Sequence, residues 1–185
     1  MIWRLFRRDD SRNRAIETLH KRINDASRAP ALYTALGVPD SVEGRFECLS
    51  LHVILVLRRL ETLPPPAADV AQDLVNSVFL QLDSSLRELG VGDFGVPKRM
   101  KKLGAAFYGR AENYGAALAT ADEHALGLAL ARNVLGTDED GAGAGLARYV
   151  MASGASLQDA SLDDLLEAGP RFPEPGAFAD PRSAP

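Results

Sequence analysis

Four positively charged side chains lie at the start of a predicted helix, where they are suited to bind a negatively charged partner. They follow Pro97, which fits a first helical position because its missing N–H would be unpaired there anyway. We call them the basic cluster: Lys98, Arg99, Lys101 and Lys102. The helix dipole favours anions at an N-terminus, so cations gain nothing locally from this position. A solvated charged face is the other interpretation of such a run.

Aromatic residues lie close to the basic cluster in the sequence. Phe94 precedes the cluster, and Phe107 and Tyr108 follow it on the same predicted helix. We expect these three rings to form the apolar part of a partner-binding surface, and Arg110 to add a further positive charge. A surface that mixes aromatic, small and basic residues is suited to hold an apolar helix of a partner in a groove.

Three further residues are predicted to position this surface. Asp83 lies at the edge of the apolar stripe of the preceding helix, and two interpretations remain open. It is either a solvated helix position or the partner of a basic residue on the next helix, such as Lys98 or Arg110. Asp93 and Arg45 are also expected to position elements rather than to bind the partner.

The sequence contains no recognisable catalytic or metal-binding motif. Cys48 and His52 are four residues apart, which is a spacing compatible with two metal ligands on one helix face. A zinc site usually needs three or four protein ligands, and only His20 and His124 remain as soft candidates. We therefore interpret Cys48 and His52 as core residues. No phosphate-binding loop, dinucleotide fingerprint or nucleophile elbow is present, so we predict no catalytic residue, metal or cofactor.

The partner-binding residues are predicted to lie on two helices joined by a tight connector. The first helix is expected over residues 67–89 and ends at Gly90, because glycine can adopt the left-handed conformation that terminates helices. Residues 91–95 form the connector, and the second helix is expected over residues 97–120.

The remaining sequence predicts an all-α fold, a single irregular helical bundle of about six to eight helices. The apolar run from Leu49 to Leu57 lies inside a helix expected over residues 40–63, with Asp40 and Glu43 as a capping box. This helix is apolar nearly all round, so we expect it at the centre of the fold. Further helices are expected over residues 10–28, 31–37, 122–135 and 146–152, with a last one ending near residue 169.

Composition and length indicate one domain with two short extensions. We expect an N-terminal arm over residues 1–9, a helical domain over residues 10–169 and a disordered proline-rich tail over residues 170–185. The formal net charge is −4, so the chain as a whole is not attracted to nucleic acid. The only cysteine is Cys48, which excludes an intrachain disulfide.

The N-terminal residues mix aromatic and basic side chains, a composition that suits a membrane interface. Trp3 and Phe6 are the candidate contacts with lipid, and the alternative is a frayed terminus in which Trp3 packs on a neighbouring helix. The apolar run is too short for a secretory signal, and no transit peptide precedes the helical domain. We therefore expect a protein of the bacterial cytoplasm that can lie peripherally on the inner membrane.

Several spaced motifs resemble the ubiquinol–cytochrome c chaperone family, which includes mitochondrial Cbp3-type assembly factors and their alphaproteobacterial relatives. One block runs from Asp83 to Asp93 and continues through Val96 to Lys101 and Phe107 to Tyr114. A second block lies upstream, in Glu43-Gly44-Arg45-Phe46-Glu47, Leu51-His52 and Leu60. Together the blocks span roughly residues 30–135.

The resemblance implies an all-helical chaperone, without enzymatic activity, that handles newly made cytochrome b during assembly of the cytochrome bc1 complex. Two other functions remain open. A helical adaptor could bind the ribosome or RNA through the same basic cluster, although the acidic net charge weakens this and DNA is not expected. A small-molecule binder or enzyme would need a pocket between helices.

Overall fold

The protein is an all-α bundle, as the hydrophobic periodicity predicts. The computed structural model describes the backbone of residues 2–179 and the side chains of residues 11–179. Within them lie seven α-helices: α1 (Ile2–Ala26), α2 (Pro30–Thr34), α3 (Val42–Glu61), α4 (Ala67–Glu88), α5 (Gly95–Ala119), α6 (Glu123–Leu130) and α7 (Ala144–Leu157). Two π-helical segments, η1 (Ala131–Leu135) and η2 (Asp164–Ala168), and the 3-10 turn η3 (Pro175–Phe178) complete the described elements. The predicted fold class and number of helices are confirmed.

Helix α3 is the centre of the bundle. It packs against α1, α4, α5 and α7. From Glu47 to Val56 every residue is buried, because the apolar side chains in this run cover all sides of the helix. The N-cap lies one residue later than predicted: the hydroxyl of Ser41 accepts a hydrogen bond from the Gly44 N–H at 3.0 Å, and the helix begins at Val42. Asp40 instead pairs with Arg45, so the predicted capping box is wrong.

His52 forms a buried hydrogen-bonded link between α3 and α7. Its Nδ1 lies 2.7 Å from the Cys48 carbonyl, and its Nε2 lies 2.7 Å from the Tyr149 hydroxyl. A neutral ring with its proton on Nδ1 satisfies both contacts, because Nε2 can then accept from the tyrosine. Burial lowers the pKa of His52 to about 4, although the Cys48 carbonyl acts in the opposite direction. The predicted core position of Cys48 and His52 is confirmed.

This histidine predicts a loss of stability in acid. Because the pKa of His52 is lower in the folded chain than in the unfolded one, the unfolded chain binds more protons between pH 6.5 and 4. We expect the free energy of unfolding to fall by about 2 kcal/mol between pH 7 and pH 5 from this group. Urea denaturation at both pH values measures it. The variant His52→Gln should lose less stability over this interval, and an equal loss in both proteins would contradict the assignment.

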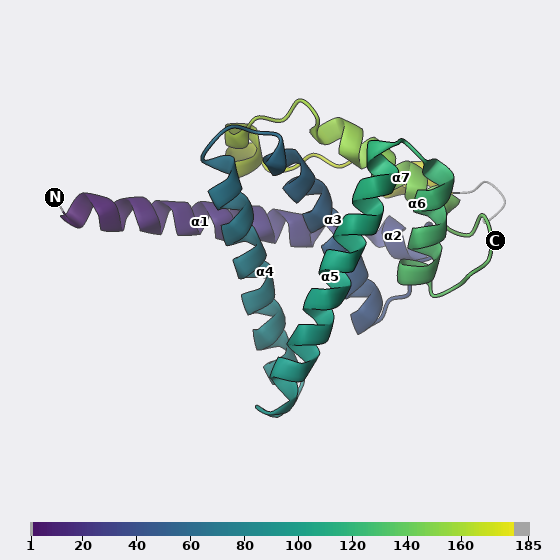
Figure 1. The fold of residues 1–185 in the computed structure, drawn as a ribbon, viewed down its shortest axis with the longest axis horizontal. Helices are drawn as coiled ribbons and strands as arrows, with labels where there is room; N and C mark the ends of the chain where they lie inside the picture. The colour runs from purple at the N-terminus through teal and green to yellow at the C-terminus, as the bar shows by residue number, and fades with distance from the viewer. Residues whose placement is uncertain (1, 180–185) are drawn as a thin grey trace.

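Helices α4 and α5 form an antiparallel hairpin that projects from the bundle (Figure 1). Helix α4 ends at the connector, where Gly90 has a φ of 80°, in the left-handed region predicted for it. Helix α5 then begins without a capping side chain. The Gly92 carbonyl accepts from the Gly95 and Val96 N–H groups, and Pro97 has no N–H to satisfy. The first backbone N–H groups of α5 therefore find hydrogen-bond acceptors without an acidic capping residue.

Helix α1 packs across α3 and α4, and its N-terminal part extends beyond the bundle (Figure 1). Arg12 forms an ion pair with Asp73 of α4 at 2.6 Å, and His20 contacts the Ser77 hydroxyl at 2.9 Å. The helix begins at Ile2 rather than near residue 10, so the expected arm continues the first helix. The side chains of Trp3 and Phe6 lie outside the described residues. None of the described helices combines the length and apolar character that a membrane crossing requires.

The C-terminal segment packs on the bundle, and the disorder predicted for residues 170–185 is wrong as far as residue 179. Phe172 contacts the His52 ring edge-on, with centroids 4.8 Å apart, and Phe178 contacts Tyr149 at 5.8 Å. Arg148 donates to the Phe178 carbonyl, and Ser156 donates to the Arg171 carbonyl. Aromatic burial therefore orders a segment whose prolines prevent a regular helix. Residues 180–185 lie outside the described residues.

Candidate partner-binding surface

The basic cluster is fully displayed on the first turns of α5. All four side chains are exposed, and none forms an ion pair or hydrogen bond with a residue that the structure describes. Lys98 lies three residues from Lys101 and four from Lys102, so like charges are neighbours on the helix surface and repel each other. The first turn of α5 contains no acidic residue that would offset them. The positive charges of the cluster thus destabilise the helix locally, through their mutual repulsion and, at Lys98 in the first turn, through the helix dipole.

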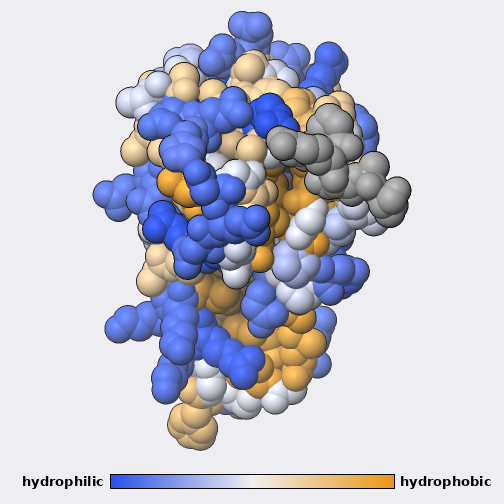
Figure 2. Space-filling view, turned by 90° about the vertical axis from the view of Figure 1, so that its right-hand side faces the viewer, coloured by the Kyte–Doolittle hydropathy of each residue, from blue (hydrophilic) through white to orange (hydrophobic). Residues whose placement is uncertain are grey.

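The projecting hairpin also displays apolar side chains. Phe94, at the connector, is fully exposed at 102%, and Tyr108 is 60% exposed. Leu80 of α4 and Leu89, just after its end, are more than half exposed as well. Only one other large apolar side chain among the described residues is comparably exposed, Val42 at the start of α3. In the space-filling view, apolar surface gathers at the lower end of the molecule, which the hairpin forms, beside hydrophilic side chains (Figure 2).

The two neighbouring aromatic residues of α5 have opposite environments. Phe107 is only 1% exposed and lies edge-on to Phe79 of α4, with ring centroids 5.7 Å apart. The prediction that Phe107 belongs to the surface is therefore wrong, because its side of α5 faces α4 and the core. Tyr108 stacks on the outer side of Phe79 with an interplanar angle of 13°. Phe79 thus contacts both the buried ring of Phe107 and the exposed ring of Tyr108.

Arg110 is largely buried and pairs within the chain, contrary to the expectation that it adds a positive charge to the exposed surface. Its guanidinium forms a two-point ion pair with the Glu47 carboxylate of α3: Nη2 donates to Oε1 at 2.6 Å, and Nε donates to Oε2. The two side chains are only 18% and 9% exposed. Burial raises the pKa of Glu47, and Arg110 offsets part of that rise. The pair joins α5 to the central helix and so sets where the hairpin projects.

Arg87 connects two of the predicted positioning residues. Its Nε donates to Asp83 one turn earlier, and its Nη1 donates to Asp93 in the connector, both at 2.6 Å. Asp83 therefore pairs with Arg87 of its own helix, and the alternative pairing with Lys98 or Arg110 is wrong. These ion pairs are exposed, so they contribute little to stability, but they fix the connector against the end of α4.

Arg45 lies outside this arrangement. Its Nε donates to Asp40 at 2.8 Å, so it braces the turn before α3 rather than the hairpin. The described residues contain no group of three or more His, Cys, Asp or Glu side chains that could hold a metal ion. The described residues of the hairpin therefore present positive charge and apolar surface to a partner, and they form no metal-binding group.

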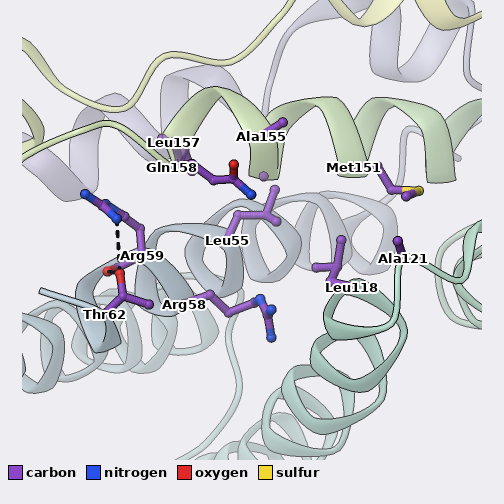
Figure 3. Close-up of a pocket in the computed structure, with 11 residues that line it drawn as sticks. Leu55, Arg58, Arg59, Thr62, Leu118, Ala121, Met151, Ala155, Leu157 and Gln158 are labelled. Carbon is purple, nitrogen blue, oxygen red and sulfur yellow. Dashed lines mark hydrogen bonds between the residues drawn. The ribbon is translucent and has the colours of Figure 1, made fainter.

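A second feature, which the sequence interpretation did not identify, is a pocket of about 360 Å³ lined by α3, α5 and α7 and by the residues just after their C-termini (Figure 3). Its apolar wall includes Leu55, Leu118, Met151 and Leu157, and Arg58 and Arg59 lie at its polar side. The only sequence signal was the pair of arginines that ends the apolar run of α3. The pocket could not be inferred from that pair, because its walls come from helices about 100 residues apart.

The chain is similar to a described protein family and to a solved structure. The model of the ubiquinol-cytochrome C chaperone family matches residues 34–172, a range that contains the whole α4–α5 hairpin and the pocket. The crystal structure of the Cbp3 homolog from Brucella abortus is similar over 97% of this chain and 100% of that chain, with 38% sequence identity and a TM-score of 0.83. No curated protein matches the chain.

Proposed function

This chain belongs to the ubiquinol-cytochrome C chaperone family, and from that premise we propose that it binds newly made cytochrome b for assembly of the cytochrome bc1 complex. It holds this client without catalysis of its own. The observation that supports the proposal best concerns residues 11–179: within them, one projecting hairpin carries both cations without an ion-pair partner and four of the five exposed large apolar side chains. A newly made membrane protein offers apolar helices with charged flanking segments, which a surface that mixes apolar and charged side chains can contact.

The hairpin is built to keep this surface in place. The buried pair of Arg110 and Glu47 attaches the middle of α5 to α3. At the far end, Arg87 connects α4 with the connector that carries Phe94. Tyr108 leans on Phe79, so its ring is oriented before a client arrives. Preorganisation of this kind lowers the entropic cost of binding. In this proposal the basic cluster, Phe94 and Tyr108 contact the client, and the other named residues position them.

We place this work in the bacterial cytoplasm, at the inner face of the membrane into which the client inserts. The N-terminal part of α1 extends away from the bundle, and its sequence combines Trp3 and Phe6 with basic residues (Figure 1). A peripheral contact of these residues with lipid would keep the hairpin near its client. Proximity to the membrane follows from the client, because cytochrome b is inserted into that membrane as it is made.

Deletion of the gene tests the proposed function. In a strain that depends on a bc1 complex, we expect loss of the cytochrome b absorbance and of bc1 activity, because unprotected client is degraded before assembly. Heme difference spectra of membranes measure the first and quinol-dependent cytochrome c reduction the second. Expression of the wild-type chain should restore both. A deletion strain with full absorbance and full activity would contradict the proposal.

The unneutralised basic cluster also favours a second candidate, binding of ribosomal RNA close to the site of client synthesis. Four cations that release counterions from phosphates would give RNA affinity a steep dependence on salt. Ribosome cosedimentation over a series of salt concentrations distinguishes the two. Loss of ribosome binding in a basic-cluster variant that still captures cytochrome b would favour RNA as the ligand of the cluster.

A further inference from the structure

The pocket between α3, α5 and α7 contains two arginines without an acidic partner. Neither Arg58 nor Arg59 forms an ion pair with a carboxylate that the structure describes. Both lie in the last turn of α3, where the helix dipole offsets part of their positive charge. The two full positive charges of the arginines still exceed the partial negative charge, about half an elementary charge, of the helix C-terminus. The pocket is therefore electropositive on one side.

Backbone and hydroxyl oxygens hold the two guanidinium groups in place. Arg58 Nη1 donates to the Gly115 carbonyl of α5 at 3.1 Å. Arg59 Nε donates to the Ala160 carbonyl at 2.8 Å, and its Nη1 donates to the Thr62 hydroxyl at 3.2 Å. A guanidinium has five N–H donors, so each arginine keeps donors for a ligand. In Figure 3 the two arginine side chains extend from α3 in different directions, Arg58 towards α5 and Arg59 towards the segment after α7, and the Gln158 side chain lies near Leu55 in this view.

The opposite wall is apolar and includes a strained residue. Leu55, Leu118 and Met151 supply hydrophobic surface from three helices. Ala121, which follows α5, has a φ of 52°, although glycine is the usual residue in this left-handed position. The Asp122 N–H donates to the Ala117 carbonyl and closes the turn. The chain thus keeps a methyl group on the pocket wall at a cost in backbone strain, a pattern that concentrates at functional sites.

We propose that this pocket binds an amphipathic anion, a small molecule with a carboxylate or phosphate group on an apolar chain. A single guanidinium group matches the geometry of a carboxylate or a phosphate, and the leucines and Met151 provide an apolar surface for the hydrocarbon chain. The volume of about 360 Å³ lies near the lower end of the range for small-molecule sites, which suits a chain of medium length. The site is separate from the hairpin surface, and the inference does not depend on the proposed client.

Calorimetric titration of the full chain with four probes tests this inference. Octanoate and octyl phosphate carry both the charge and the chain, 1-octanol carries only the chain, and acetate carries only the charge. We expect the two amphipathic anions, or one of them, to bind about tenfold or more tightly than 1-octanol and acetate. Binding of one anion and not the other would identify the head group that the arginines prefer.

Three variants connect that binding to the pocket. Arg59→Gln removes a charge and should weaken octanoate binding about tenfold. Gly154→Leu should also weaken it by filling the space; a Cβ at Gly154 meets only Leu55, at 3.8 Å, so the side chain can begin there without displacing the backbone. Arg132→Gln, at an exposed arginine that does not line the pocket, should leave binding unchanged. Absence of binding by both anions, or binding that neither pocket variant weakens, would overturn the inference.

Discussion

Replacement of the basic cluster by glutamate, in the variant Lys98→Glu/Arg99→Glu/Lys101→Glu/Lys102→Glu, is expected to weaken capture of cytochrome b about tenfold or more without loss of stability. Capture falls because four exposed cations that no described residue neutralises become anions. Stability should not fall, because all four side chains are exposed and the one nearest the α5 N-terminus, at position 98, gains about 0.3 to 1 kcal/mol from the helix dipole when it is negative. Copurification of cytochrome b with the tagged chain measures capture, and urea denaturation measures stability.

A loss of capture without a loss of stability makes the result diagnostic. A smaller, matched comparison uses Lys101→Glu/Lys102→Glu against Arg132→Glu/Arg171→Glu, since both pairs are exposed and change the net charge equally. Only the first pair should reduce capture. Equal losses from both pairs would mean that net charge, rather than the hairpin, determines binding.

The largest expected effect on stability comes from the buried ion pair between Arg110 and Glu47. Arg110→Ala should lower the free energy of unfolding by about 3 to 5 kcal/mol, because it leaves the Glu47 carboxylate buried without a partner. Replacement of both residues by apolar side chains of similar size, Glu47→Leu/Arg110→Met, should cost much less, since no unpaired charge remains. Urea denaturation of the three proteins measures the difference. A loss under about 1 kcal/mol in Arg110→Ala would show that the pair is not desolvated.

These two predictions concern residues that the sequence alone grouped together. Arg110 and the basic cluster lie on one helix and carry the same charge, so charge and proximity in sequence could not separate them. They differ because Glu47, which is 63 residues away, reaches only Arg110. Long-range pairing of this kind depends on how two helices pack, and a periodicity analysis of each helix does not contain that information.

The helices themselves were predictable for a physical reason. Apolar stripes at three- and four-residue spacing, together with Gly90 and Gly136 at helix ends, are local signals that the tertiary structure did not override. The central position of α3 followed from an apolar run on all sides of one helix. Local signals were insufficient where side chains from distant segments decide the outcome, as at Phe107 and in residues 170–179.

The C-terminal segment shows this limit most clearly. Its prolines and lack of periodicity indicated disorder, and composition alone supports that interpretation. Phe172 and Phe178 nevertheless find rings on α3 and α7, and these contacts order the backbone between them. Isolated aromatic residues in a proline-rich segment can therefore indicate packing when a bundle leaves core rings accessible at its surface.

Site-specific photo-crosslinking tests most directly whether the hairpin is the surface that binds the client. A photoreactive phenylalanine analogue at Phe94 places the probe at the fully exposed tip, and the same analogue at Val42 places it on an exposed apolar position outside the hairpin. After irradiation of growing cells, we expect a covalent adduct with cytochrome b from position 94 and little or none from position 42. An adduct of equal yield from both positions, or from position 42 alone, would contradict this account.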